Sequence, residues 1–300
     1  MQYSTFAAID IGSYDVILEI FEISKKQGIR SVDKICHRME LGKDTYTLGK
    51  IRPEMEEELC RVLADFVRIM EGYRVDDYRA TASSAISEAS NSLYVLGKIH
   101  QLTGFSVTVL SNSEQRFLSY KALAAMEDNF NKIIEKGTAI LDLDGGSFQI
   151  SLFDKDALVT TQNIRMGSLR IRERLAGIQS ETEHYEEMVE ELIWNEVSSF
   201  KKMYLKDRKI ENIMLIGDVF TDSVYQNIEE KTTKIISREN FNTWYEKIIR
   251  QSPMELAVKL GIPLENASLM YPSAVIYKCL IDMMGAEHIW IPGVHMTRGI

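Results

Sequence analysis

The chain up to Met126 alternates apolar and polar positions in an order that predicts three strands followed by alternating helices and strands. Residues 5–23 are apolar on both sides of Gly12, a pattern typical of a β-hairpin. From Pro53 to about Gly72, apolar residues recur on one stripe, which predicts an amphipathic helix. The expected strands are Phe6–Ile11, Val16–Ile23, 29–41, Tyr78–Ala82 and Phe105–Leu110, and the other expected helices are Ser84–Leu102 and Ser113–Met126.

The rest of the chain repeats this order. Three apolar runs between Thr138 and Thr161 predict a three-stranded meander, and helices and short strands follow. Because the series occurs twice, we expect a duplicated ribonuclease-H-like α/β fold with two domains, residues 1–128 and 129–300, divided near the charged segment Asp128–Lys136. The expected strands are Thr138–Leu143, Phe148–Phe153, Ala157–Thr161, Asn212–Ile216 and His288–Ile291; the expected helices are 168–176, 181–204, Ser237–Arg250, one from Ser252 to Gly261, and 266–284.

The two halves share a short motif in which a strand enters an aspartate and then turns through glycine and a hydroxyl residue. Its copies are Asp10-Ile-Gly12-Ser13 and Asp142-Leu-Asp144-Gly145-Gly146-Ser147. Glycine lets backbone N–H groups approach an anion, and an aspartate at a strand end can hold hydrated Mg²⁺ beside it. The motif therefore predicts a phosphate site at Gly12, Ser13, Gly145, Gly146 and Ser147, with Asp10 and Asp142 as metal ligands. The alternative is that the aspartates cap their own turns and that the glycines serve backbone geometry alone.

Composition narrows the class of protein. The hydrophobic fraction is 45%, the charged fraction is 26% and the net charge is −9, which together indicate a globular protein that does not bind nucleic acid. No apolar run reaches membrane-spanning length, and the first residues lack the pattern of a signal peptide. The three cysteines, Cys36, Cys60 and Cys279, form no Cys-x-x-Cys pair, so we expect thiols in a reducing cytoplasm.

Besides the two glycine turns, the chain has four further landmark segments. They are Leu-Ser-Asn-Ser-Glu-Gln at 110–115, the arginine-rich segment at 163–175, Tyr-Pro-Ser-Ala at 271–274 and Thr-Arg-Gly at 297–299. As an ordered set, they resemble the exopolyphosphatase and guanosine pentaphosphate phosphatase family of the actin-like superfamily. The resemblance implies two actin-like domains with an interdomain cleft, without the C-terminal helical domain of longer members. It also implies Mg²⁺-dependent attack of water on polyphosphate or on guanosine tetra- or pentaphosphate.

The polar positions of that family are changed here in one direction. The resemblance implies an asparagine, a serine and an arginine where this chain has Tyr14, Asp15 and Ser87. An arginine makes bidentate, permanently charged contacts with phosphate that a serine cannot replace. By the same resemblance, Asp144 and Asp218 add negative charge to the second turn and its surroundings, Gln149 replaces an acidic residue, and Asn266 stands where an arginine is expected.

The family's water-activating glutamate falls on Gln115, which follows Glu114. Glutamine cannot accept a proton at neutral pH, and general-base help contributes roughly 10²–10⁴ in rate. Gln115 can still orient water, and Glu114 is the alternative base, although adjacent helical positions point about 100° apart.

Two classes of function therefore stay open. The first is a weakened phosphoanhydride hydrolase that uses Mg²⁺ at Asp10 and Asp142, and the second is a pseudophosphatase that acts as a nucleotide-binding or regulatory module. Residues 266–284 are expected to be core, with a homodimer surface as the alternative.

Overall fold

The structure is a computed structural model, and it describes residues 3–26, 28–126, 130–176, 185–206, 208–227, 235–294 and 296–300. The chain forms two compact units. The first unit is Met1–Leu118 together with Met296–Ile300, and the second is Ser119–His295. The division falls within helix α5 (Asn112–Met126), whereas the boundary expected after residue 128 lies outside the described residues.

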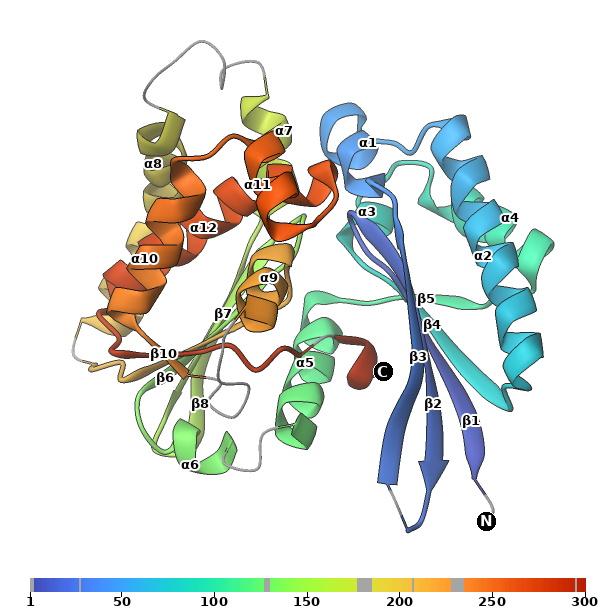
Figure 1. Ribbon diagram of the computed structural model, residues 1–300, viewed down its shortest axis with the longest axis horizontal. Coiled ribbons are helices and arrows are strands. Elements are labelled where there is room, and N and C mark those ends of the chain that lie inside the picture. The colour runs from blue at the N-terminus through green and yellow to red at the C-terminus, as the bar shows by residue number, and fades with distance from the viewer. Residues whose placement is uncertain are drawn as a thin grey trace. The chain divides into compact units, whose positions relative to one another are not determined.

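The first unit is built on a five-stranded sheet with the order β3-β2-β1-β4-β5 (Figure 1). β1, β2 and β3 form an antiparallel meander, and β4 and β5 continue the sheet parallel to β1. Asp10 in β1 lies opposite Ile17 in β2 and beside Thr81 in β4. The strands are β1 (Ser4–Ile11), β2 (Asp15–Ser24), β3 (Gly28–Arg38), β4 (Asp77–Ala82) and β5 (Val107–Val109).

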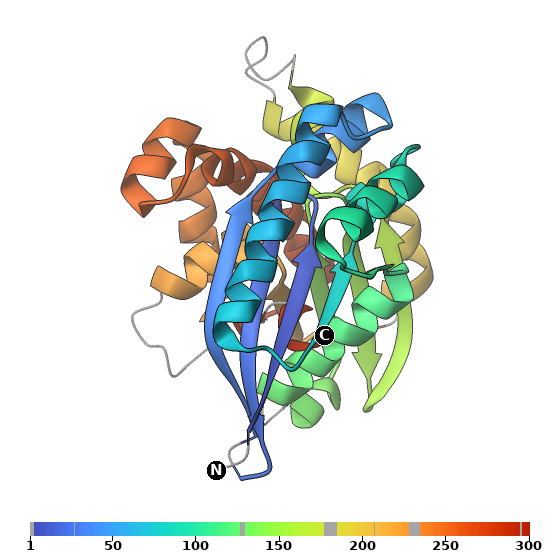
Figure 2. The ribbon, with the colours of Figure 1, turned by 90° about the vertical axis from the view of Figure 1, so that its right-hand side faces the viewer.

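Helices cover this sheet and form its core. In α2 (Pro53–Tyr73) the predicted stripe is buried, with Leu59 and Leu63 fully covered, because side chains three and four positions apart share a face. α2 runs lengthwise along the sheet beside α4 (Figure 2). The remaining helices of the first unit are α1 (Leu41–Leu48), α3 (Ser84–Ser87), α4 (Ser92–Thr103) and the first part of α5.

The second unit repeats the topology. Its six-stranded sheet has the order β10-β11-β9-β6-β7-β8, in which β6, β7 and β8 form the meander and β9 and β11 run parallel to β6. Asp142 in β6 lies opposite Gln149 in β7. The strands are β6 (Thr138–Leu143), β7 (Phe148–Asp154), β8 (Ala157–Ile164), β9 (Asn212–Ile216), β10 (Ile235–Ser237) and β11 (His288–Trp290).

Helix α12 (Leu264–Met284) is the centre of the second unit and packs against each of five other helices. Its side chains Tyr277 and Ile281 are fully buried, which confirms the expected core. The other helices are α6 (Phe130–Ile134), α7 (Ser168–Leu175), α8 (Tyr185–Phe200) with a π-helical turn at Lys201–Leu205, α9 (Val219–Asn227), α10 (Arg238–Ile249) and α11 (Pro253–Leu260).

The structure corrects three expectations. The strand predicted over 29–41 ends at Arg38, and α1 follows it. The single helix predicted over Ser84–Leu102 is two helices, because the Asn91 side chain accepts from the Ile51 N–H and donates to the Ile51 carbonyl instead of continuing the turn. Helix α9 follows β9 in a segment where no helix was predicted. Part of the predicted 181–204 helix lies outside the described residues.

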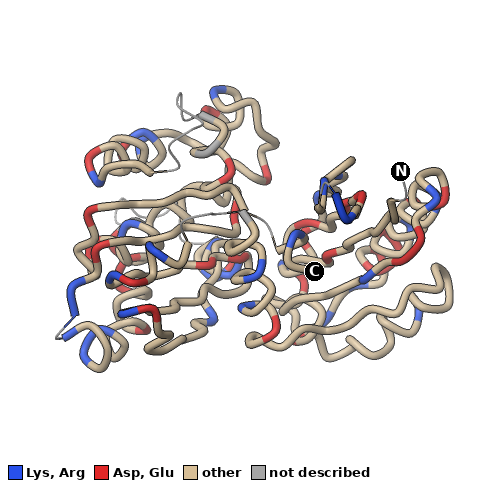
Figure 3. The backbone as a smooth tube through the Cα atoms, turned by 90° about the horizontal axis from the view of Figure 1, so that it is seen from below, with Lys and Arg blue, Asp and Glu red and all other residues tan. Residues whose placement is uncertain are grey.

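The last residues of the chain belong to the first unit. A 3₁₀ turn at Met296–Arg298 places the Thr297 hydroxyl 2.5 Å from the carboxylate of Glu19, a buried acid in β2 that also accepts from Ser31. A Cβ on Gly299 would lie 2.0 Å from the carbonyl oxygen of Leu118, so only glycine fits there. Along both units, basic and acidic residues are interspersed (Figure 3).

Candidate functional site

The two aspartate-glycine motifs occupy the same place in the two sheets. Each leaves the end of a first strand and turns back into a second strand that pairs antiparallel with it. In the first turn (Gly12–Asp15), the Gly12 N–H donates to the Asp15 carbonyl at 2.9 Å. In the second turn (Asp144–Ser147), the Asp144 N–H donates to the Ser147 carbonyl at the same distance. The repeated motif therefore marks a repeated local structure.

The hydroxyl of Ser13, a predicted phosphate ligand, is engaged by other hydroxyls of the first unit. Ser13 is fully buried, and its Oγ lies 2.8 Å from the Tyr46 hydroxyl and 3.4 Å from Ser84 Oγ. The Ser13 carbonyl accepts from the Gly42 N–H at 2.7 Å, which fastens the start of α1 to the turn. Sequence reasoning missed Tyr46, because α1 shows no apolar period.

Two residues that depart from the family pattern form a second contact in the first turn. The Asp15 carboxylate accepts from Arg38 at 2.9 Å, and the guanidinium lies 5.7 Å from the centre of the Tyr14 ring. The carboxylate raises the pKa of the adjacent Cys36 thiol, although burial is the larger cause of its rise to about 12. Asp15 thus holds the Arg38 guanidinium beside the first turn, and the ion pair neutralises its charge. Ser87, in place of the expected arginine, is exposed.

Asp10 and Asp142 occupy corresponding strand ends and have different surroundings. The Thr81 hydroxyl donates to Asp10 Oδ1 at 3.3 Å. Ser119 donates to Asp142 Oδ2 at 2.6 Å, and burial raises the pKa of Asp142 to about 6 against that hydrogen bond. Near neutral pH a fraction of the Asp142 carboxyl groups is therefore protonated, and a bound cation would favour the ionised form.

The second turn is held through its carbonyl groups by the start of α7. The Ser168 N–H donates to the Asp144 carbonyl, and Arg170 donates from its backbone to Gly145 and from Nε to the Gly146 carbonyl at 2.8 Å. Asp144 occupies one of the predicted phosphate-binding groups, because its Oδ1 accepts a hydrogen bond from the Gly145 N–H at 2.6 Å. Arg170 is thus a structural support of this turn.

A glycine and a buried acid follow β9, beside the second turn. Gly217 has a φ of +103°, and a Cβ there would lie 2.6 Å from Asp142 Oδ1 and 2.6 Å from the Leu143 carbonyl. Asp218 is buried, and burial raises its pKa to about 7, opposed by hydrogen bonds from the Thr221 N–H and the Tyr277 hydroxyl. Asp218, one of the positions that depart from the family pattern, therefore lies in the interior of the second unit.

Glu114 and Gln115, the predicted catalytic residues, lie in the first turn of α5. Glu114 Oε2 accepts from the N–H and the hydroxyl of Ser111 at 2.8 and 2.7 Å, and these bonds lower its pKa. The Glu114 N–H donates in return to Ser111 Oγ at 3.3 Å, which completes a capping box. The Gln115 amide donates to the Leu110 carbonyl at 3.3 Å. Both side chains thus make local contacts at the helix start, and their catalytic roles stay predictions.

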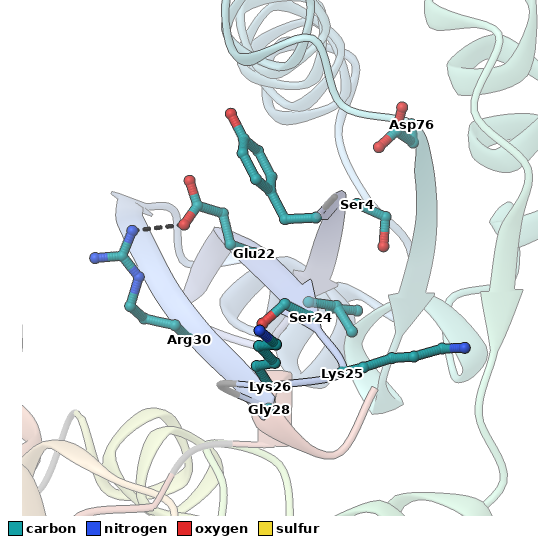
Figure 4. A pocket seen from close by; sticks show the side chains of 10 residues that line it. Ser4, Glu22, Ser24, Lys25, Lys26, Gly28, Arg30 and Asp76 are labelled. Atoms are coloured by element: carbon teal, nitrogen blue, oxygen red, sulfur yellow. Dashed lines mark hydrogen bonds and ion pairs between the residues drawn. The ribbon is translucent and has the colours of Figure 1, made fainter. Parts of the chain in front are cut away.

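A hollow of about 930 Å³ lies in the first unit around the β2–β3 hairpin and the beginning of β1, and it contains neither turn. Glu22 and Arg30 line it and form an ion pair of 2.5 Å, and Lys25 and Lys26 project nearby (Figure 4). This hollow is therefore separate from the candidate site.

Within the residues that the structure describes, no three histidine, cysteine or acidic side chains gather as a metal-binding group. Each unit instead has one aspartate at the end of the strand before its turn, Asp10 in β1 and Asp142 in β6. Magnesium is commonly held by one or two carboxylates together with water and substrate phosphates, so the residues present fit such an ion. No helix in the described part of the chain is long and apolar enough to cross a membrane.

The repeated sheet order, with an aspartate-bearing turn at the same strand end of each unit, defines a two-domain actin-like protein. The Ppx/GppA phosphatase family model matches residues 19–300, so the chain belongs to that family. The exopolyphosphatase structure from Cytophaga hutchinsonii aligns over 99% of this chain and 96% of its own, with a TM-score of 0.88 and 16% identity. The Aquifex aeolicus family member aligns over 99% and 96%, with a TM-score of 0.78 and 18% identity.

Among proteins of known function, the bifunctional 3-dehydroquinate synthase/phosphatase of Fusobacterium nucleatum is 21% identical over 94% of this chain and 44% of its own length. Exopolyphosphatase 1 of Mycobacterium leprae is 25% identical over 48% of this chain and 41% of its own length. The chain thus spans less than half the length of these relatives.

Proposed function

We propose that this chain binds a phosphoanhydride ligand, polyphosphate or guanosine penta- or tetraphosphate, through its two turns and hydrolyses it slowly. The observation that carries the proposal is the repeated turn, with the same internal hydrogen bond and an aspartate two residues before it in each unit. Family membership and an exopolyphosphatase among the relatives support the substrate class.

Asp10 and Asp142 are the proposed magnesium ligands. Magnesium, when bound, would neutralise charge that develops on the transferred phosphoryl group. The raised pKa of Asp142, about 6, leaves it largely ionised at pH 7.5 and therefore competent to hold the ion. The proposed anion-binding residues are Gly12, Ser13, Gly145, Gly146 and Ser147. The Gly12 N–H donates to Asp15 and the Gly145 N–H to Asp144, so these two hydrogen bonds must break before the N–H groups can bind the ligand.

The slow rate follows from the residue at position 115. An amide there orients water without accepting its proton, so the hydrolysis loses general-base help of roughly 10²–10⁴ in rate. The Glu114 carboxylate is engaged by Ser111, and its lowered pKa makes it a poorer base still.

The test pairs phosphate release with calorimetric titration of tripolyphosphate, long-chain polyphosphate and guanosine pentaphosphate, each with Mg²⁺. We expect measurable binding, slow release, and a loss of at least 100-fold in release for Asp142→Asn. Asp154→Asn, a charge change of the same kind at the end of β7, is the matched control and should leave both quantities unchanged. Binding of none of these ligands by the wild-type chain would end the proposal.

A second candidate is a regulatory module that binds the ligand without turnover. The observation in its favour is that the α5 start presents an amide at 115 and a carboxylate already engaged at 114. If this candidate holds, release stays at background and Gln115→Glu does not restore it, because several other polar groups are also replaced. Recovery of 100-fold or more by Gln115→Glu alone would favour the hydrolase instead.

We also place the chain in a reducing compartment, as in the cytoplasm. Its three cysteines are free thiols, and Cys60 and Cys279 are buried, which suits a protein that needs no disulfide. Labelling with a thiol reagent before and after denaturation would test this. We expect little labelling of the native protein, because the raised pKa of Cys36 disfavours its thiolate, and three reactive thiols in the unfolded protein.

A further inference from the structure

Three hydroxyl groups of the first unit meet at the first turn. They come from Ser13 in the turn, Tyr46 on α1 and Ser84 at the start of α3. The Tyr46 oxygen lies 2.8 Å from each serine oxygen, whereas the two serine oxygens are 3.4 Å apart. The phenol hydroxyl therefore bridges the serines, and Ser13 is fully buried beneath it.

An oxygen held at 2.8 Å by two hydroxyls has the position that a phosphate oxygen takes when two serines bind it. We propose that Tyr46 is an internal occupant of the first turn, so that its hydroxyl must leave before Ser13 and Ser84 can bind an anionic oxygen of the ligand. This inference rests on the proposed function and adds a regulation to it. Ligand binding at the first turn competes with a side chain of the same chain.

The helix that carries Tyr46 is fixed independently of its hydroxyl. The Gly42 N–H donates to the Ser13 carbonyl, and the Thr45 hydroxyl donates to the Ala85 carbonyl at 2.7 Å. Buried Asp44 accepts from the N–H and from Nε of Arg52 at 3.0 and 2.9 Å. Because these bonds hold α1 against the turn, changing Tyr46 removes the occupant and leaves the supporting backbone in place.

The experiment measures tripolyphosphate affinity by calorimetry in the full-length protein with Mg²⁺. Tyr46→Ala removes both the hydroxyl and the ring, and we expect it to bind about tenfold more tightly than the wild type. Tyr46→Phe keeps the ring and should show a smaller gain. Tyr73→Ala, a surface tyrosine of the same unit whose hydroxyl donates to Asp33, is the matched control and should leave affinity unchanged.

Ser13→Ala separates the occupant from a general loosening of the unit. In the wild type its net effect should be small, because the variant loses the contact with the ligand and the competing contact with Tyr46 together. In the Tyr46→Ala background only the contact with the ligand is lost, so Ser13→Ala should cancel most of the gain. Thermal unfolding of each variant verifies that it is folded.

Equal or weaker binding by folded Tyr46→Ala, while the wild type binds, would overturn this inference and leave the proposed function standing. Absence of binding in the wild type and in every variant would count against both. A Ser13→Ala effect of the same size in both backgrounds would also overturn the inference, because the hydroxyl would then be open to ligand from the start.

Discussion

The first and second turns share their backbone and differ in what occupies them. In the first turn, the hydroxyl of Tyr46 on α1 contacts the Ser13 hydroxyl. In the second turn, Asp144 folds its own carboxylate onto the Gly145 N–H, and Arg170 supports the carbonyl groups. The strand-turn-strand backbone is therefore the same in the two units, whereas the side chains around the two turns make different internal contacts.

The glycines near the two turns also differ in how well they would tolerate a side chain. The end of β6 that leads into the second turn, Asp142 and Leu143, packs against Gly217, whose backbone conformation and surroundings exclude a side chain. The first turn contains Gly12, which has an ordinary φ, and a Cβ added there would lie 2.9 Å from a carboxylate oxygen of Asp15. The second copy is therefore the more rigidly determined of the two.

The largest expected effect follows from this difference. Gly217→Ala should lower the free energy of unfolding by about 4 kcal/mol, because it combines backbone strain with a clash against Asp142 and Leu143. Gly12→Ala should cost only about 1–2 kcal/mol, since the contact is partly with a side chain that can move. Urea unfolding measures both. Gly97→Ala, where a Cβ meets open space on α4, is the control and should stabilise by about 0.5–1 kcal/mol. An equal loss at the two turn-related positions would break the comparison.

A smaller effect is expected from the buried acid beside the second turn. Because the pKa of Asp218 is raised to about 7 in the folded state, the folded protein keeps a proton that the unfolded chain has already lost. Its contribution to stability is therefore full below about pH 4 and is lost as pH rises through 7. Asp218→Asn should flatten that decline.

Unfolding free energies between pH 4 and 8 test this expectation. Asp142→Asn is the comparison variant, since Asp142 titrates in the same unit with a pKa of about 6. The same slope in the wild type and in Asp218→Asn would show that Asp218 contributes nothing.

The smallest of these effects concerns the charge in the second turn. Asp144→Asn keeps an oxygen that can accept from the Gly145 N–H and removes the negative charge, so tripolyphosphate should bind about fivefold more tightly. The gain should be larger without Mg²⁺, because the cation screens the same repulsion. Titration with and without the metal measures this. A loss of affinity confined to the magnesium titration would identify Asp144 as a metal ligand instead.

Much of the fold could be predicted from the sequence. Strand positions followed from apolar runs. The helix expected from Ser252 to Gly261 is α11, which begins with a capping box between Ser252 and Glu255. The repeated motif predicted two equivalent turns, which the strand registers confirm. These features are local, so neighbouring residues are enough to determine them.

The occupants of the turns could not be predicted in this way. Helix α1 is short, and its buried residues include Gly42, Asp44 and Thr45, so no apolar period identifies it. Tyr46 meets Ser13 across 33 positions of sequence, and Asp44 is buried because Arg52 pairs with it. Such contacts depend on tertiary packing, which composition and spacing do not encode.

The return of residues Met296–Ile300 to the first unit has a consequence for how the protein is made. Glu19 is buried early in the chain, yet one of its hydrogen-bond donors, Thr297, is synthesised only after the whole second unit. On the ribosome, the first unit therefore waits for its final piece until translation has passed residue 297, and an amino-terminal fragment that stops at α5 carries a buried acid without that donor.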